Sequence, residues 1–166
     1  VLRGVAEAIN QPQGRVYQRP CAAVLGDAAC RVDVTSQGYG IDVTVTALRG
    51  DAELVIPGQA GVPDGWYRHG QVGILTGAAA GQVGVVKRDR ELEAGRVIEL
   101  WETFSGEVQP GDDMRLVAGS AKRVETCREK FDNMLHFRGF PRIPGEDWLV
   151  SYPVSTGTNN GGSLTE

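Results

Sequence analysis

Glycine and proline occur so often in this chain that its regular elements must be short. The 166 residues include 23 glycines and 8 prolines, and several runs between them alternate apolar with polar side chains. The clearest run is YGIDVTVTAL, in which Ile41, Val43 and Val45 would share one face. Alternation of this kind is typical of a strand with one buried face. With 41% hydrophobic residues, the chain can also bury a core behind such strands.

Similar β-rich runs recur along the chain as far as residue 119. They are ELVI, WYRHGQVGILTG, GQVGVVKRD, RVIELWETF and DDMRLVAG, and a brief period-2 run extends from Arg31 to Val34. Ala78–Ala80 separate two of these runs, which predicts a hairpin, and QPGD is a turn signal before the last run. The count predicts a mainly β fold, a small barrel or sandwich of about six or seven strands.

The pattern then changes. In KRVETCREKFDNMLHF the apolar side chains recur at helical spacing, which predicts one C-terminal helix with Cys127 on its inward face. Gly139 and Pro141 would end this helix. On such a helix Cys127 and His136 would lie about 13 Å apart along the axis, too far to act as nucleophile and base. We therefore interpret His136 as a packing histidine, and His69 as a turn or strand residue.

The composition divides the chain into three regions. Residues 1–14 contain the turn-prone NQPQG and are expected to be a linker or the end of a preceding domain. Residues 15–150 form the predicted β-rich domain, with its helix and a loop-rich cysteine module. Residues 151–166 are polar and rich in glycine, which predicts a flexible tail. The chain starts without methionine, so we expect it to be the C-terminal part of a longer protein.

The charge of the chain argues against nucleic acid as a partner. The formal net charge is -4, whereas phosphate contacts require clustered lysine and arginine. We therefore expect no sequence-specific binding of DNA or RNA. The sequence also contains no apolar run of the roughly 20 residues that a membrane span needs, so we expect no stable membrane insertion.

The three cysteines, Cys21, Cys30 and Cys127, are an odd number and cannot all pair within the chain. A Cys21–Cys30 disulfide, three buried thiols, and ligation of a metal or cluster all remain open. Cys21 and Cys30 lie on a compact loop-and-turn element, nine residues apart. That spacing is wider than the Cys-x-x-Cys of zinc knuckles, so it does not itself identify a metal site.

Long stretches of the chain resemble a known group of proteins. They are GRVYQRPCAAVLGDAACRVD, WYRHGQVGILTGAAAGQVGVVKRD and, most specifically, KFDNMLHFRGFPRIPGEDW. These residues resemble the C-terminal half of the BR0599-like tail hub proteins of siphophages and gene transfer agents, over about residues 15–150. In this half the family is similar to the minor tail protein of lambda-like siphophages, which carries an iron–sulfur cluster.

The resemblance implies a ligand set as well as a fold. In this family four cysteines hold the cluster, one pair nine residues apart and a later pair seven apart. Cys21, Cys30 and Cys127 match three of them, and Ser120 stands at the fourth, where the family usually has cysteine. A hydroxyl is a harder and far less acidic ligand than a thiol. The resemblance therefore leaves three outcomes: a cluster of the 4Fe–4S type with three cysteines and one non-cysteine ligand; a three-iron cluster; or a site that has lost its metal while the fold persists.

The resemblance also implies a function without catalysis. Such proteins form a trimeric hub at the tail tip, joining the distal tail protein ring to the central fibre or spike protein around the DNA exit channel. We expect the chain to assemble into the particle within the bacterial cytoplasm and to use the cluster as a structural staple. The alternatives are a redox-sensitive cluster switch that controls tail opening, and a cell-wall hydrolase domain.

Overall fold

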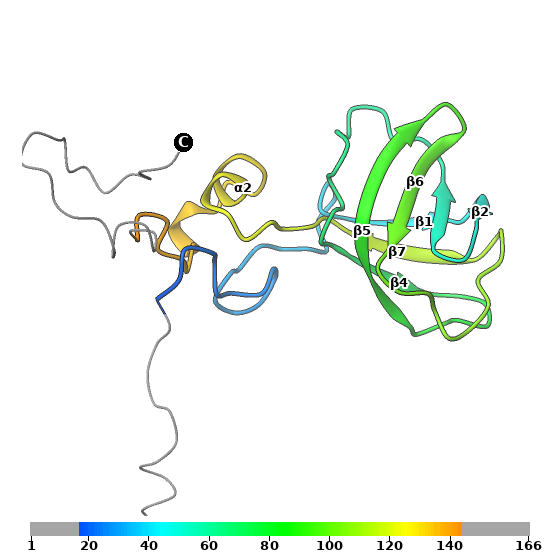
Figure 1. Cartoon of the computed structure of the whole chain (residues 1–166), viewed down its shortest axis with the longest axis horizontal. Coiled ribbons are helices and arrows are strands. Elements are labelled where there is room, and N and C mark those ends of the chain that lie inside the picture. Colours follow the sequence, from blue (N-terminus) through cyan, green and yellow to red (C-terminus); the bar gives the residue numbers. More distant parts are fainter. Residues whose placement is uncertain (1–16, 144–166) are drawn as a thin grey trace, which may run out of the picture.

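The computed structural model describes residues 17–143, which form two lobes (Figure 1). The sheet lobe comprises residues 40–117 and contains the strands of the described chain. The cysteine lobe comprises residues 17–39 and 118–143 and contains two short helices and the three cysteines. The chain therefore leaves the cysteine lobe, forms the sheet and returns. The predicted regions 1–14 and 151–166 lie outside the described residues.

Seven antiparallel strands make up one sheet, which confirms the predicted mainly β fold with six or seven strands. They are β1 (Gly40–Thr44), β2 (Ala47–Arg49), β3 (Glu53–Ile56), β4 (Gln71–Ile74), β5 (Val83–Leu92), β6 (Gly95–Leu100) and β7 (Asp113–Val117). Their order across the sheet is β1-β7-β4-β5-β6-β3-β2. Among the described residues the two outer strands do not pair with each other, so the sheet is curled but is not a closed barrel.

Alternation of side chains along the strands explains why they form one core. In β7, Met114 and Leu116 are fully buried and their neighbours face outward. Ile56, Ile74 and Ile98 from three other strands are buried in the same cluster. β4 and β5 form the hairpin that was predicted around Ala78–Ala80. Burial of these aliphatic side chains supplies the main driving force for folding of the sheet lobe.

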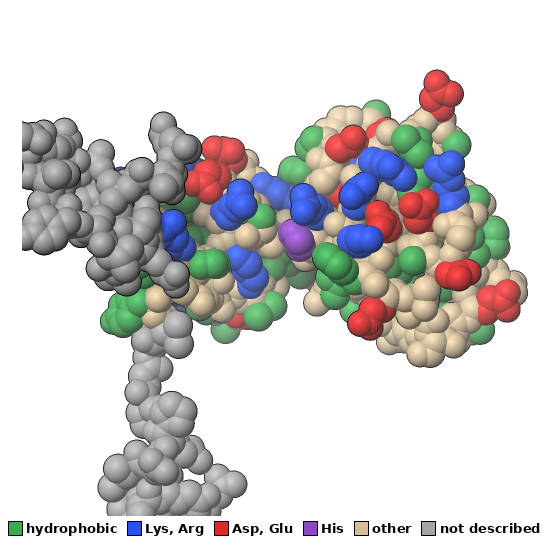
Figure 2. Space-filling model, in the orientation of Figure 1, with side chains coloured by type: hydrophobic (Ala, Val, Ile, Leu, Met, Phe, Trp, Pro, Cys, Tyr) green, Lys and Arg blue, Asp and Glu red, His purple; other side chains and the backbone are tan. Residues whose placement is uncertain are grey.

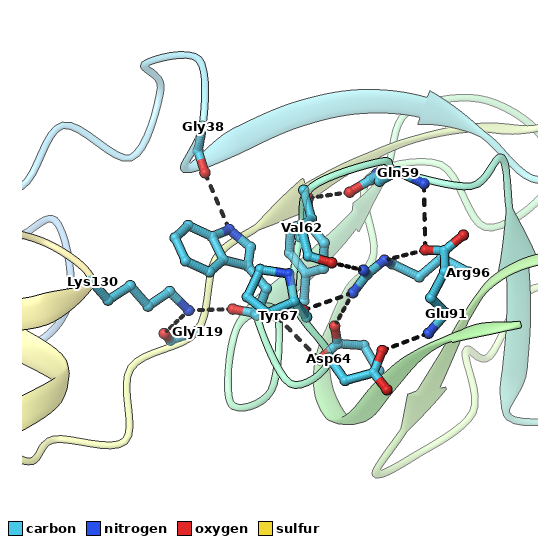
Figure 3. A network of polar contacts seen from close by, with 12 residues as sticks. Gly38, Gln59, Val62, Asp64, Tyr67, Glu91, Arg96, Gly119 and Lys130 are labelled. Carbon is cyan, nitrogen blue, oxygen red and sulfur yellow. Dashed lines mark hydrogen bonds and ion pairs between the residues drawn. The ribbon is translucent and has the colours of Figure 1, made fainter.

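A buried ion pair fixes the loop between β3 and β4 to the sheet (Figure 3). Arg96 in β6 and Asp89 in β5 have no exposed side-chain surface, and their charged atoms are 2.6 Å apart. Arg96 also donates to the backbone oxygens of Val62 and Pro63 and pairs with Glu91 at 3.0 Å. Because each polar atom of the guanidinium group finds a partner, the buried charge is tolerated.

Two elements differ from the sequence prediction. The run from Arg31 to Val34 is not a strand, because Arg31 adopts a left-handed backbone with φ of 63° and the run pairs with no strand in the described chain. Its valines are instead part of the cysteine lobe's core. The predicted helix over residues 122–137 is also wrong in extent. It consists of α2 (Val124–Glu129) and a 3-10 turn, η1 (Met134–His136).

The interruption of the helix has a local cause. Asp132 has a φ of 45°, which no α-helix accommodates. The backbone N–H of Asn133 donates to the carbonyl of Cys127 at 2.9 Å and closes a turn after α2. Of the apolar face expected for one long helix, Phe131 is buried but Leu135 is 93% exposed. No helix within residues 17–143 is long and apolar enough to cross a membrane.

Candidate cysteine site

The cysteine lobe brings together residues that lie far apart in the sequence. Cys21, Cys30 and Cys127 line one small cavity, together with Ser120 and His136. The remaining lining residues are Ala23, Leu25, Val32, Lys122, Arg123 and Phe131. All four positions that the family resemblance implied as ligands therefore face a common space. All three cysteines are free thiols, so the Cys21–Cys30 disulfide is not formed in this structure.

Asp27 shapes the turn that carries Cys30. Its carboxylate accepts hydrogen bonds from the backbone N–H of Cys30 at 2.6 Å, Ala29 at 2.9 Å and Val24 at 2.8 Å. These bonds, led by that from Cys30, lower the pKa of Asp27 below its usual value. The carboxylate therefore stays ionised at neutral pH and replaces a regular element as the support of this turn.

Backbone contacts join the two chain segments of the lobe. The N–H of Cys21 donates to the carbonyl of Lys122 at 2.8 Å, and that of Ala22 donates to the carbonyl of Arg138 at 3.3 Å. The side-chain amide of Asn133 donates to the carbonyl of Cys30 at 2.6 Å. Each cysteine of the first segment is thus anchored to the second segment, close to Cys127.

Cys127 is held as a protonated thiol. Its Sγ donates to the carbonyl of Asn133 at 3.1 Å. Burial raises the pKa of Cys127, and the neighbouring thiols of Cys21 and Cys30 raise it further. A reactive cysteine nucleophile requires the opposite, a lowered pKa. A bound metal would reverse this preference, because thiols lose their protons when they ligate.

Two hydrogen bonds point at the other sulfur atoms. The backbone N–H of Arg138 lies 3.3 Å from Sγ of Cys21, and the amide nitrogen of Asn133 lies 3.8 Å from Sγ of Cys30. Donors of this kind favour a negatively charged sulfur, and they are one of the features that tune iron–sulfur clusters. Lys122 and Arg123 add positive charge to the wall of the cavity.

The structure overturns the sequence-based separation of Cys127 from His136. Because α2 ends at Glu129, the chain turns back and places His136 in the wall of the same cavity. The Nδ1 atom of His136 lies 2.7 Å from Oδ1 of Asn133. Sequence reasoning missed this position because it assumed one continuous helix. The Asp132-Asn133 pair was the available signal, since both residue types favour turns and left-handed backbone.

The donor chemistry of the cavity fits a thiolate-bound cluster. A single tetrahedral ion needs ligand sulfurs about 3.8 Å apart, whereas a cluster gives each thiolate its own iron and spreads the sulfurs more widely. Within residues 17–143 no three His, Cys, Asp or Glu side chains are placed to hold one metal ion.

The cavity volume is about 20 Å³, the size of roughly one water. The walls would therefore have to move apart to admit a cluster.

Backbone strain gathers around this cavity. Three non-glycine residues of the lobe have positive φ: Arg31 at 63°, Lys122 at 60° and Asp132 at 45°. Arg31 follows Cys30, and Lys122 lies two residues after Ser120. Such a conformation costs about 1–2 kcal/mol for an ordinary residue and tends to occur at functional sites. The lobe's own core is small: Ala23, Cys30, Val32, Ala118 and Phe131. A lobe with so small a core is expected to need another source of stability, such as a disulfide or a bound metal.

Lys130, just after α2, attaches the cysteine lobe to the sheet lobe (Figure 3). Its ammonium donates to the backbone oxygens of Trp66 and, at 2.8 Å, Gly119, and lies 4.4 Å from the centre of the Trp66 ring. The hydroxyl of Tyr39 donates to the carbonyl of Lys130 at 3.1 Å. Burial lowers the pKa of Lys130 to about 8, although the Asp89 carboxylate acts in the opposite direction.

His69 is a turn residue, as the sequence suggested. It has a φ of 64°, and its backbone N–H donates to the carbonyl of Val86 at 2.9 Å. Its side chain lines an open cavity at the junction of the lobes, together with Arg68, Arg123 and Lys130. Figure 2 shows several lysine and arginine side chains close to a histidine at this junction. The cysteines line a separate cavity.

Comparison with known proteins connects both chain segments of the lobe to phage protein families. Residues 65–147, half of the chain, match the family described as "Phage conserved hypothetical protein BR0599". This range includes Ser120, Cys127 and His136. Residues 1–33 match a second family, "Baseplate hub protein, N-terminal attachment domain", in a range that includes Cys21 and Cys30.

A solved structure supports the same relationship over nearly the whole chain. It is a chain of the "Virion of native gene transfer agent (GTA) particle", with a TM-score of 0.77 and 50% sequence identity. The match covers 98% of this chain and 56% of that chain, so the present chain spans little more than half of its relative's length. No curated protein sequence matches. The extent of the first family match and this virion relative show that the chain belongs to the phage family BR0599.

Proposed function

We propose that the chain is a structural, non-enzymatic component of a virion, acting as a hub at the tail tip of a phage-like or gene transfer agent particle. Its family, and its 50% identity to a chain of a gene transfer agent virion, support a place in the particle. The match of residues 1–33 to the attachment domain of a baseplate hub supports the hub role. There it would form a homotrimer that links the distal tail ring to the central fibre or spike protein around the DNA exit channel.

We further propose that Cys21, Cys30 and Cys127 hold an iron–sulfur cluster of the 4Fe–4S type. The observation that carries this proposal is the shared cavity, since thiols from two distant chain segments line it together. When bound, the cluster would supply metal–thiolate bonds whose free energy adds to that of folding. Two hydrogen-bond donors would support the ligating thiolates. The backbone N–H of Arg138 favours negative charge on the sulfur of Cys21, and the side-chain amide of Asn133 does so on that of Cys30.

A hydrolase that uses Cys127 and His136 fits the structure less well than a cluster does. The two residues line one cavity, but burial raises the pKa of the Cys127 thiol, and the thiol donates a hydrogen bond to the backbone carbonyl of Asn133. The isolated protein should accordingly fail to lyse cell walls, and lysis that disappears in Cys127→Ala would contradict a structural role.

The cluster is tested by composition and stability. Anaerobically purified complete protein should contain iron and acid-labile sulfide, and Cys127→Ala should lose both and melt at a lower temperature. Leu135→Ala is the matched control, because this side chain belongs to the same lobe but is 93% exposed. It should keep the metal and the melting temperature. Colourless wild-type protein with three titratable thiols would refute the cluster.

The hub role is tested in the particle. Cys127→Ala should lower the yield of assembled tails, whereas Leu135→Ala should not. A map of the assembled tail that places the protein away from the tip would refute the hub role and leave the cluster assay unaffected. The two parts of the proposal can therefore fail separately.

A redox-sensitive switch is the second candidate, because Cys21 and Cys127 are partly exposed and the site is within reach of solvent. A reversible paramagnetic signal that changes together with DNA release would favour the switch. A redox-silent cluster would leave only the structural staple.

A further inference from the structure

We propose that His136 supplies the fourth ligand of the cluster, through Nε2, in place of Ser120. This assignment rests on the proposed cluster and goes beyond the three cysteines. His136 lines the same cavity as Cys21, Cys30 and Cys127. It arrives there through the break after α2 and the 3-10 turn η1, which ends at His136 itself.

Elimination narrows the choice of a fourth ligand. Four polar side chains other than cysteine line the cavity: Ser120, Lys122, Arg123 and His136. Protonated lysine and arginine have only donors and no lone pair for a metal. The ammonium of Lys122 is in any case directed at the carbonyl of Ala23. No carboxylate lines the cavity. Among the described residues, the fourth position is therefore a choice between a hydroxyl and an imidazole.

The hydrogen bonds of Asn133 determine the tautomer of His136. The Nδ2 atom of Asn133 lies 2.6 Å from the carbonyl oxygen of Cys30, which can only accept. This end of the amide must be the NH₂ group, so the other end, Oδ1, is the acceptor facing Nδ1 of His136 at 2.7 Å. Nδ1 must then carry the proton. In the neutral imidazole, Nε2 is left with a free lone pair.

This arrangement is the one that metal-bound histidines use. A ligating imidazole almost always donates its other N–H to a fixed oxygen, which sets the tautomer and the ring orientation. Asn133 does this here and also holds the carbonyl of Cys30. One residue therefore positions two of the four proposed ligands.

Ser120 is the weaker candidate on chemical and structural grounds. Its hydroxyl would have to lose a proton far less acidic than that of a thiol before it could bind iron as an alkoxide. Its Oγ accepts a hydrogen bond from the backbone N–H of Lys122 at 3.3 Å, in the turn where Lys122 has positive φ. Histidine, by contrast, is an established replacement for cysteine on iron–sulfur clusters and raises their reduction potential.

Pulsed electron paramagnetic resonance on the dithionite-reduced complete protein tests the assignment. Growth with ¹⁵N-histidine labels both histidines of this chain, His69 and His136, and variants at each position assign the coupling. The wild type should show a coupling between the cluster and a histidine nitrogen that changes with the isotope. His136→Gln should lose it, and His69→Asn should keep it, because asparagine tolerates the left-handed backbone of that turn.

Two more variants separate ligation from packing. His136→Cys should retain iron and sulfide, lose the nitrogen coupling and shift the reduction potential downward, since a thiolate adds negative charge where the imidazole was neutral. Ser120→Ala should leave iron content, coupling and potential unchanged. A cluster without histidine coupling, or one that Ser120→Ala removes while His136→Gln retains it, overturns the ligand assignment alone. Wild-type protein without iron overturns the cluster proposal and this assignment with it.

Discussion

Replacement of Lys130 by methionine should weaken the attachment between the two lobes. Methionine keeps much of the length and apolar character of the side chain but removes the ammonium, which donates to the carbonyls of Trp66 and Gly119. The Trp66 carbonyl keeps a second donor, the backbone N–H of Gly119 at 3.1 Å. The carbonyl of Gly119, a buried residue, accepts a hydrogen bond from no other donor among the described residues. The loss is therefore concentrated on the Gly119 carbonyl, within the cysteine lobe, and on the Trp66 ring, across the junction between the lobes.

The magnitude follows from these contacts. An unsatisfied buried carbonyl costs about 1–3 kcal/mol, and loss of the ammonium over the Trp66 ring, 4.4 Å from its centre, costs about 0.5–2 kcal/mol. The variant also escapes the desolvation that lowers the pKa of Lys130. We expect the free energy of unfolding to fall by about 1–3 kcal/mol, as the balance of these terms.

Urea unfolding of the complete protein at pH 7, followed by circular dichroism, measures this change. Lys87→Met is the matched control, because Lys87 also lies over an indole ring and its ammonium is also bonded, here to the Glu99 carboxylate, but its side chain is 40% exposed. The control should change stability by no more than about 1 kcal/mol. If Lys130→Met destabilises the protein no more than Lys87→Met does, the attachment does not depend on this ammonium.

Three further predictions concern other parts of the molecule. The pKa of Lys130 falls from 10.5 to about 8 on folding, so unfolding takes up a proton between these values. The stability of the wild type relative to Lys130→Met should therefore rise from pH 8 to 10.5, and a flat or falling difference in urea titrations would contradict the buried ammonium. Phe131→Ala should cost about 3–5 kcal/mol in urea unfolding and speed iron loss, because Phe131 is 7% exposed and lines the cavity; unchanged stability would refute its role in the core. Asp89→Asn, which removes the buried carboxylate charge 2.6 Å from Arg96, should cost about 3–5 kcal/mol, and a loss below 1 kcal/mol would show that the charge of Asp89 is dispensable.

The strands were predictable because one face of each strand is buried, and the alternation of apolar and polar residues in the sequence shows which face. β7 illustrates this, with Met114 and Leu116 buried on one face and Arg115 partly exposed between them. The alternation from Arg31 to Val34 led to a wrong prediction of a strand, because burial of alternate side chains produced the same pattern there. Val32 and Val34 do face a core, but without a neighbouring strand to pair with in the described chain. Periodicity reports which side chains are buried and does not report the backbone's hydrogen-bond partners.

The sequence predicted only part of the candidate cysteine site. The association of Cys21, Cys30 and Cys127 came from family resemblance, since no local spacing unites residues from two ends of the chain. The apolar residues after Lys122 have helical spacing, so the break at Asp132, which has a left-handed backbone, was not predicted. Helix propensity is summed over many residues, and one unfavourable aspartate changes the sum little. That single dihedral brings His136 into the wall of the cavity. The fourth ligand was therefore sought only at Ser120.

The position of the sheet between the two halves of the cysteine lobe also sets an order of events in time. Cys21 and Cys30 leave the ribosome before β1, and Cys127 and His136 leave after β7. Gly40 and Val117 pair in the finished sheet, which brings the two returning chains side by side. Pairing of the strands therefore accounts for most of the entropic cost of bringing the two halves of the cysteine lobe together, before the thiols come close to one another. If the proposed cluster is bound, its insertion would therefore require a chain whose sheet is complete and in register.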